Sequence, residues 1–244
     1  LDCKDIPLLW GISLKDQTDD YVKMVKFGCE PKIYNNWGFQ DRDIRLGVKM
    51  PANIPGQIPL NVLYLYTKPG QLVVDPMAGG GSTIDACLVM GRKCRAYDVE
   101  PNKYIADPTK ARKDIIKNDV TQGLPDRAKN CDLMFLDPPY YNMVFDLYKD
   151  IDDFYVFVRK LAEVTDSVLK KGGYVAYIIQ DMTEKGSYCL SGESYKIFSE
   201  KFAYVDHISA PLSTEEFLPQ QVIKAKADHH LLGSNRDLYI FKKI

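Results

Sequence analysis

From about residue 60 onward, hydrophobic positions gather in short runs that are separated by turn residues. Runs rich in β-branched and aromatic side chains predict strands at 72–75, 94–99, 132–136, 174–179, 203–208 and 238–241. Helical spacing predicts helices at 83–90 and 146–171, ended by Gly91 and by the Gly172-Gly173 pair. Because strands and helices alternate over short connections, we expect an α/β fold with a doubly wound, mostly parallel sheet.

Two stretches depart from this rhythm. Residues 1–53 mix charges evenly and lead into the prolines Pro51, Pro55 and Pro59, which disfavour a continuous helix. We therefore expect an N-terminal arm, irregular or helical, over residues 1–53 and one large domain over residues 54–244. Within that domain the polar stretch 209–235 separates the last two predicted strands, and loops of such length usually carry function or are disordered.

Composition narrows the class of protein. With 244 residues and 45% hydrophobic content, the chain can bury one full core. Its 32 basic and 33 acidic residues nearly balance, so contact with nucleic acid requires a local patch. The six cysteines form no C-x-x-C pair, and no run of about 18 apolar residues suggests a membrane span. We expect a reduced, cytoplasmic protein with no membrane contact.

A glycine-rich loop follows the first predicted strand and enters a helix, in the sequence Asp75-Pro76-Met77-Ala78-Gly79-Gly80-Gly81-Ser82-Thr83. Such a loop brings backbone N–H groups close to a ligand. A dinucleotide site would place a glycine at position 84, which is Ile84, so NAD and FAD are disfavoured. A nucleoside without phosphates fits better, because Asp98 lies about 20 residues on, where a carboxylate grips ribose hydroxyls. Asp119 is the matching carboxylate after the next strand of such a sheet, which would lie between Asp98 and Asp119.

The most specific pattern is Asp137-Pro138-Pro139-Tyr140, directly after a predicted strand. Open α/β sheets bind ligands at the carboxyl ends of their strands. An exocyclic amine on a base is a poor nucleophile, and accepting hydrogen bonds from both of its N–H groups activates it. The Asp137 carboxylate takes one, and the stiff prolines can hold the Pro138 carbonyl to take the other. Tyr140 offers a ring on which a flipped base stacks.

Together, the glycine motif and the tetrapeptide resemble those of the DNA amino-methyltransferases, the N6-adenine and N4-cytosine family. The likeness extends over about residues 54–242 and includes Gln57-Ile58-Pro59, which is similar to the start of the family's helix that closes the cofactor pocket. Met77 stands where the family usually has Phe, and it should still pack.

This resemblance implies a Rossmann-like methyltransferase fold with an antiparallel strand near the C-terminus, and S-adenosyl-L-methionine as cofactor. It implies Asp137, Pro138, Pro139 and Tyr140 as catalytic residues. The expected cofactor-binding residues are Gln57, Ile58, Pro59, Asp75, Pro76, Met77, Ala78, Gly79, Gly81, Ser82, Thr83, Asp98, Val99, Asp119 and Val120. An aspartate-initiated tetrapeptide is commoner in adenine enzymes, which favours N6 of adenine in DNA as the target.

Several alternatives stay open from the sequence. These are an N4-cytosine DNA methyltransferase, an RNA methyltransferase acting on guanine N2, and a non-catalytic subunit with this fold. DNA is the expected partner, with RNA as the alternative, and a homodimer is left open. The basic excess near the C-terminus, including Lys224 and Lys226, makes residues 209–235 the expected contact with the target. His229-His230 lack a nearby ligand cluster, so we expect no metal.

Overall fold

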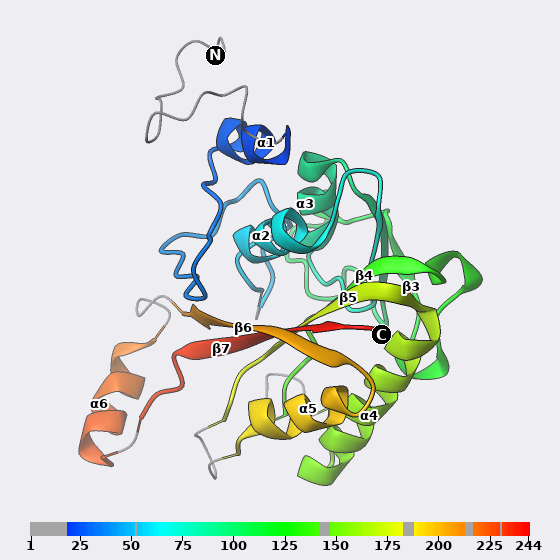
Figure 1. The fold of residues 1–244 in the computed structure, drawn as a ribbon. Helices are drawn as coiled ribbons and strands as arrows, with labels where there is room; N and C mark the ends of the chain where they lie inside the picture. Colours follow the sequence, from blue (N-terminus) through cyan, green and yellow to red (C-terminus); the bar gives the residue numbers. More distant parts are fainter. Residues whose placement is uncertain (1–18, 52, 142–146, 183–187, 213–216, 230) are drawn as a thin grey trace.

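A computed structural model describes residues 19–51, 53–141, 147–182, 188–212, 217–229 and 231–244 (Figure 1). Its centre is a seven-stranded sheet with the order β3-β2-β1-β4-β5-β7-β6. Neighbouring strands are parallel except at β7, which runs antiparallel to both β5 and β6. The strands are β1 (Leu72–Asp75), β2 (Lys93–Asp98), β3 (Ile115–Lys117), β4 (Cys131–Leu136), β5 (Leu169–Ile179), β6 (Ala203–Pro211) and β7 (Asn235–Lys242). The predicted mostly parallel sheet with an antiparallel C-terminal strand is confirmed.

Helices cover both faces of the sheet and give three layers (Figure 1). On one face lie α1 (Asp19–Phe27), α2 (Gln57–Tyr66) and α3 (Ser82–Met90), and on the other lie α4 (Ile151–Val168) and α5 (Leu190–Ser199). Alternation along β4 shows how one strand serves both cores. Leu133 and Phe135 pack toward α2 and α3, whereas Met134 and Leu136 pack toward α4 and α5. None of the described helices is long and apolar enough to cross a membrane.

The long helix differs at both ends from its prediction over 146–171. It begins after Asp150, whose side chain accepts a hydrogen bond from the Asp153 amide at 2.9 Å, and it ends at Val168. Asp152 and Asp153 lie in the first turn of this helix, where negative charge is favourable, and Asp146 lies outside the described residues. Gly172 and Gly173 do not end the helix, because β5 already begins at Leu169 and includes them. Gly172 has φ +77° and bonds the Lys243 carbonyl through its amide, so it serves a bend in the strand.

The expected loop over 209–235 is shorter and more ordered than predicted. Strand β6 continues to Pro211, β7 begins at Asn235, and a helix, α6 (Pro219–Ala227), lies between them. This helix projects from the body beside the starting end of β7 (Figure 1), and Ala225 is its buried residue. Residues 213–216 and 230, which include His230, lie outside the described residues. The pattern also did not predict α5, whose apolar residues are interrupted by polar ones.

The N-terminal arm packs against the body over its described part. Met24, Trp37 and Leu46 are at most 1% exposed and belong to the core under α2 and α3. The Trp37 amide donates to the Ser209 carbonyl at 2.8 Å, which ties the arm to β6. Asp20 forms a bidentate ion pair with the buried Arg92, with both N···O distances at 2.8 Å. The arm is thus partly helical, and its side chains complete one of the two cores.

Candidate active site

The glycine loop between β1 and α3 satisfies most of its own amides. Asp75 accepts from the Met77 amide at 3.1 Å, and the Tyr97 carbonyl accepts from the Ala78 amide at 2.8 Å. Asp98 accepts from the Gly79 amide at 3.0 Å, and Gly81 closes a turn on Ala78. A phosphate would need these amides free, because a phosphate site uses several converging N–H groups. The loop therefore fits a ligand held by its sugar and base, as the sequence predicts.

Gly80 is required for a different reason from the one expected. A Cβ at this position would stand 2.2 Å from the Val48 carbonyl oxygen, and the Val48 amide donates to the Gly80 carbonyl at 2.8 Å. The close neighbour of Gly80 is thus the backbone of the arm. Gly81, in contrast, caps α3 in the left-handed conformation at φ +80°, which glycine adopts without strain.

The two predicted ribose carboxylates lie at the carboxyl ends of neighbouring strands. Asp98 ends β2, is half-buried, and accepts from the amides of Gly79 and Glu100 at 3.0 and 2.9 Å. Each of its oxygens keeps a lone pair for a ligand hydroxyl. Asp119 follows β3 and caps a short turn by accepting from Thr121 at 2.9 Å. Both positions agree with the sequence prediction.

The tetrapeptide follows β4 at the same edge of the sheet. The Tyr140 hydroxyl donates to a carboxylate oxygen of Asp137 at 3.2 Å, and Tyr148 donates to the Pro139 carbonyl at 2.9 Å. Among the residues that the structure describes, none donates to the Pro138 carbonyl. The Asp137 carboxylate and the Pro138 carbonyl are thus the acceptors that the tetrapeptide leaves for a ligand.

Burial dominates the electrostatics of the two site aspartates. It raises the pKa of Asp137 to about 6, although the charge of Arg236 and the Tyr140 hydroxyl oppose the rise. It raises the pKa of Asp75 to about 7, against hydrogen bonds from Thr83 and the Met77 amide. Desolvation disfavours a charged carboxylate, so the pKa of each group lies near neutral pH, where it can gain or lose a proton. Such perturbed carboxyls at a strand edge mark a functional site.

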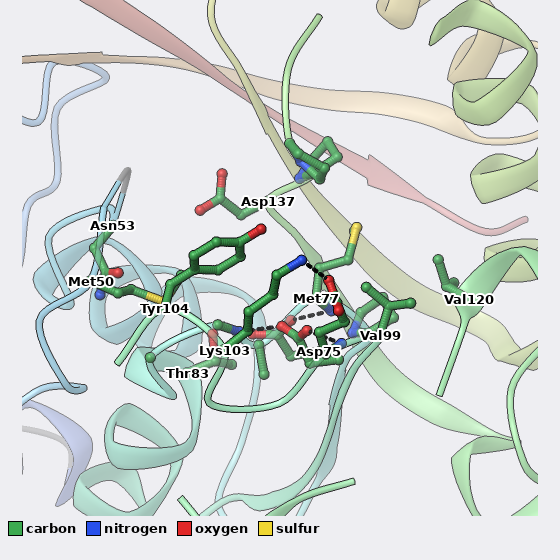
Figure 2. Close-up of a pocket in the computed structure, with 18 of the residues that line it drawn as sticks. Met50, Asn53, Asp75, Met77, Thr83, Val99, Lys103, Tyr104, Val120 and Asp137 are labelled. Carbon is green, nitrogen blue, oxygen red and sulfur yellow. Dashed lines mark hydrogen bonds and ion pairs between the residues drawn. The ribbon is translucent and has the colours of Figure 1, made fainter. Parts of the chain in front are cut away.

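One cavity of about 470 Å³ joins these elements (Figure 2), a size typical of small-molecule sites. Its walls come from the ends of β1, β2, β3 and β4, and from the arm. It brings together most of the predicted residues, namely Asp75, Pro76, Met77, Ala78, Gly79, Ser82, Thr83, Asp98, Val99, Asp119, Val120, Asp137, Pro138, Pro139 and Tyr140.

Gln57, Ile58, Pro59 and Gly81 do not line this cavity. The Gln57 side chain instead donates to the Asp41 carbonyl at 2.8 Å and accepts from the Asp43 amide at 3.2 Å, which fastens the arm. Ile58 and Pro59 are buried in the core of α2. The start of α2 thus contacts the arm, and the arm lines the cavity.

Several lining residues were missed by sequence reasoning. Met50 and Asn53 come from the end of the arm, Ile54 directly follows it, and Lys103 and Tyr104 follow β2 (Figure 2). Lys103 forms an ion pair with Glu100 and lies over the Tyr104 ring at 5.2 Å from its centroid. For the residues before Gln57, the proline-rich stretch was the available signal, because an irregular segment between the arm and the domain can pass beside the pocket.

Comparison with known proteins agrees with this picture. Residues 13–107 match the family model described as DNA methylase (N6_N4_Mtase), and this confirms the resemblance over that part of the chain. The match begins upstream of residue 54, so it includes part of the arm. The sequence search against curated proteins gives no match.

Solved methyltransferase structures share the fold. TrmN from Thermus thermophilus is 14% identical with a TM-score of 0.53, over 80% of this chain and 50% of that one, so the chain spans half of its length. Precorrin-6y C5,15-methyltransferase from Geobacter metallireducens is 10% identical with a TM-score of 0.52, over 84% and 98% of the two chains. The Burkholderia thailandensis 1,6-didemethyltoxoflavin-N1-methyltransferase, solved with S-adenosylhomocysteine, is 12% identical with a TM-score of 0.52, over 77% of each chain.

The named substrates of these proteins differ, so the shared fold does not specify a substrate. The predicted Rossmann-like methyltransferase fold is confirmed. The bound product in the Burkholderia thailandensis enzyme agrees with the cofactor that the sequence predicts, S-adenosyl-L-methionine.

Proposed function

We propose that this chain is a methyltransferase that uses S-adenosyl-L-methionine to methylate the exocyclic amine of a base in DNA, with N6 of adenine as the favoured target. The observation that carries the proposal is the tetrapeptide at the end of β4. There the Tyr140 hydroxyl is the described donor to Asp137, and no described residue donates to the Pro138 carbonyl. Both acceptors border the cavity that we assign to a nucleoside. The family match over residues 13–107 supports DNA as the substrate class.

The residues of the cavity fit the proposed cofactor. Asp98 offers carboxylate oxygens at a strand end for ribose hydroxyls, and Val99 and Val120 flank it with apolar surface for an adenine ring. The occupied amides of the glycine loop agree with a ligand that has no phosphate. When bound, S-adenosyl-L-methionine supplies a methyl group on a positively charged sulfur, which an amine lone pair can displace.

Amine activation falls to the tetrapeptide. The ionised Asp137 carboxylate accepts from one N–H of the target amine and the Pro138 carbonyl accepts from the other. Both bonds shift the amine toward the geometry of a nucleophile, and Asp137 is placed to hold the proton that the amine loses. Because the Tyr140 hydroxyl donates to Asp137, it orients the carboxylate. Burial raises the pKa of this hydroxyl, so it remains a donor at neutral pH.

The Tyr140 ring has a second proposed role. It is 6% exposed and borders the cavity, where a base turned out of the duplex can stack on it. Adenine is favoured over cytosine by the aspartate that begins the tetrapeptide, as in the adenine members of the resembling family. We assign contact with the rest of the duplex to α6, because Lys224 and Lys226 are exposed on a helix that projects from the body.

The decisive experiment incubates the protein with isotope-labelled S-adenosyl-L-methionine and either unmethylated plasmid DNA or total RNA. Mass analysis of the digested nucleosides then reports which base carries the label. We expect labelled N6-methyladenosine from DNA. Label in N4-methylcytosine or in N2-methylguanosine from RNA would move the activity to the alternative substrate. If no base is labelled by protein that binds the cofactor, the proposal is wrong.

A further inference from the structure

Arg236 is a largely buried arginine for which the described residues supply no hydrogen-bond acceptor. It lies on β7 and is 8% exposed, yet among the described residues its guanidinium makes no hydrogen bond and no ion pair. A guanidinium carries five N–H donors and stays charged at all ordinary pH values. Among the described residues, the fully buried side-chain atom without a hydrogen-bond partner is Thr165 Oγ1, so the guanidinium nitrogens of Arg236 keep some contact with solvent. A ligand that enters from there would meet donors that no acceptor of the described chain occupies.

The chain itself shows what a structural buried arginine is like. Arg92 is 5% exposed, and its side chain donates to Thr67, to the carbonyls of Leu63 and Met90, and to both carboxylate oxygens of Asp20, at 2.6 to 3.1 Å. Arg92 therefore ties α1, α2 and α3 together. Arg236 has nothing comparable, which separates the two arginines by role.

Position relates Arg236 to the tetrapeptide. Along β7, Arg236 alternates with Leu238 and Ile240, which pack in the core under α2 and α3. Along β4, Asp137 continues the row of Leu133 and Phe135, which pack in that same core. Arg236 and Asp137 thus share one face and one edge of the sheet, with β5 between their strands.

The electrostatics of Asp137 agree with this placement. Arg236 is the positive group that lowers the pKa of Asp137 against burial, and it also lowers the pKa of Tyr140. The other titratable groups that interact with Asp137 are Asp75 on β1, Tyr140, and Tyr177 on β5, and none of these is cationic. The cofactor cavity is lined from the other side, by the ends of β1 to β4, and it does not include Arg236.

We propose that Arg236 is a target-binding residue, whose buried guanidinium donates hydrogen bonds to an acceptor group of the nucleotide that lies against Asp137. This inference rests on the proposed function of the site. The acceptor is a ring nitrogen or carbonyl oxygen of the base, or a phosphate oxygen beside it, since a guanidinium binds each of these. The same charge helps to keep Asp137 ionised for amine activation.

The test compares Arg236→Met and Arg236→Lys with the wild type, using unmethylated plasmid DNA, and includes Arg159→Met as a control. Arg159 is exposed on α4 and pairs with Glu200, so the control removes one charge from a surface position. For Arg236→Met we expect the KM for DNA to rise about ten- to a hundredfold, the value of losing a hydrogen bond to a charged group. Cofactor affinity should stay within about twofold, and Arg159→Met should match the wild type.

Two further readouts separate this role from a structural one. Removal of an unpartnered buried charge should leave Tm unchanged or raised in Arg236→Met, whereas Arg92→Met should lower Tm because it breaks several bonds. The acid limb of the pH profile of kcat/KM should move to higher pH in Arg236→Met and return in Arg236→Lys, which keeps the charge.

Salt dependence identifies the acceptor. A phosphate contact predicts that the slope of log affinity against log salt decreases by about 1 in Arg236→Met. A base contact predicts an unchanged slope and methylation of additional sites. If the wild type methylates DNA but Arg236→Met has the same KM, or loses Tm as Arg92→Met does, the assignment of Arg236 is wrong. If the wild type itself methylates no nucleic acid, the proposed function is wrong and the assignment falls with it.

Discussion

The two halves of the sheet treat their polar groups in opposite ways. In the half formed by β1, β2 and β3, polar groups at the carboxyl edge are paired within the chain. Asp98 accepts a hydrogen bond from the Gly79 amide, and Asp119 accepts one from the Thr121 amide. Asp85 accepts from the Arg112 guanidinium at 2.8 Å. Burial raises the pKa of Asp75 on β1 as well as that of Asp137, but Asp75 also accepts the Met77 amide. In the half formed by β4, β5 and β7, Tyr140 is the described donor to Asp137, and Arg236 has no hydrogen-bond partner among the described residues.

This difference separates two kinds of binding. A half whose loops are already satisfied is rigid, and it suits a ligand of constant shape such as a cofactor. A half whose largely buried charged groups have few partners from the chain gains most from a ligand that supplies them. Incomplete pairing of this kind is commonly kept at functional sites. Substitutions that disrupt one half should therefore leave the other half intact, except where the two halves depend on each other.

Asp137→Asn should have the largest effect and should be confined to the half around β4. The amide keeps the shape of the side chain but loses the charge and the capacity to hold a proton, so we expect the single-turnover methylation rate to fall about 10²- to 10⁴-fold. Cofactor affinity, measured by calorimetry, should change less than about twofold. A folded variant that methylates at nearly the wild-type rate would return the tetrapeptide to a purely structural turn.

Asp98→Ala should produce the converse, with loss of cofactor affinity. Losing a charged acceptor typically costs about 1.5 to 3 kcal/mol, or about ten- to a hundredfold in Kd. The matched control is Asp132→Ala, because Asp132 accepts the Leu72 amide at 2.7 Å but lies at the start of β4, at the opposite edge of the sheet. The control should lower Tm and spare cofactor affinity. Equal losses of affinity in both variants would contradict the ribose role of Asp98.

The pH dependence of the reaction should report Asp137. Its pKa in the folded protein is raised to about 6, so below that pH the carboxyl is protonated and cannot accept the amine proton. We expect kcat/KM to reach a plateau above about pH 6 and to decrease about tenfold per pH unit below it. The profile of Asp137→Asn should be flat over this range. A wild-type profile without an acid limb would contradict ionised Asp137 as the acceptor.

Gly80→Ala tests the joint between the arm and the glycine loop. A methyl group there would clash with the Val48 carbonyl oxygen, which a Cβ would approach to 2.2 Å. Overpacking of this kind typically costs about 1 to 3 kcal/mol, so we expect Tm to fall by about 2 to 12 °C. Because Met50 and Asn53 line the cavity, cofactor affinity should also fall. Gly38→Ala is the control, since its nearest neighbour, Pro211, would be at an ordinary 3.8 Å.

Local sequence predicted much of the cofactor half, by which we mean the half of the sheet formed by β1, β2 and β3. The strand over 72–75 pairs with β2, and the glycine loop bonds Asp98 at the tip of β2, so much of this half is one strand–helix–strand unit that is continuous in the sequence and leaves a clear local pattern. The arm did not, because its contacts with Gly80 and Ser209 are made over long separations. Gly80 was not among the predicted cofactor-binding residues, yet it lines the cavity, and only the fold reveals that the arm also approaches it.

The target half, formed by β4, β5 and β7, was predicted less completely. The tetrapeptide was recognisable because four consecutive residues define it, so it can be identified without knowledge of the fold. Arg236 looked like one of several basic residues near the C-terminus, and its burial depends on β7 returning antiparallel beside β5. Likewise α6 has little apolar pattern, since Ala225 is its buried residue, so a polar loop was the natural expectation.

The smallest expected effect concerns the outermost contact of the target half. Lys224 and Lys226 are exposed on α6, and we expect each to neutralise one DNA phosphate. Reversing both charges to glutamate should weaken DNA binding modestly at about 0.1 M salt and lower the slope of log affinity against log salt by about 2. The control reverses Lys129 and Lys201, which are exposed just before β4 and β6, at the edge away from the cavity. Cofactor affinity should be unchanged in both pairs, because neither contacts the cavity. If the two pairs weaken DNA binding equally, the effect is one of net charge, and α6 does not contact the duplex.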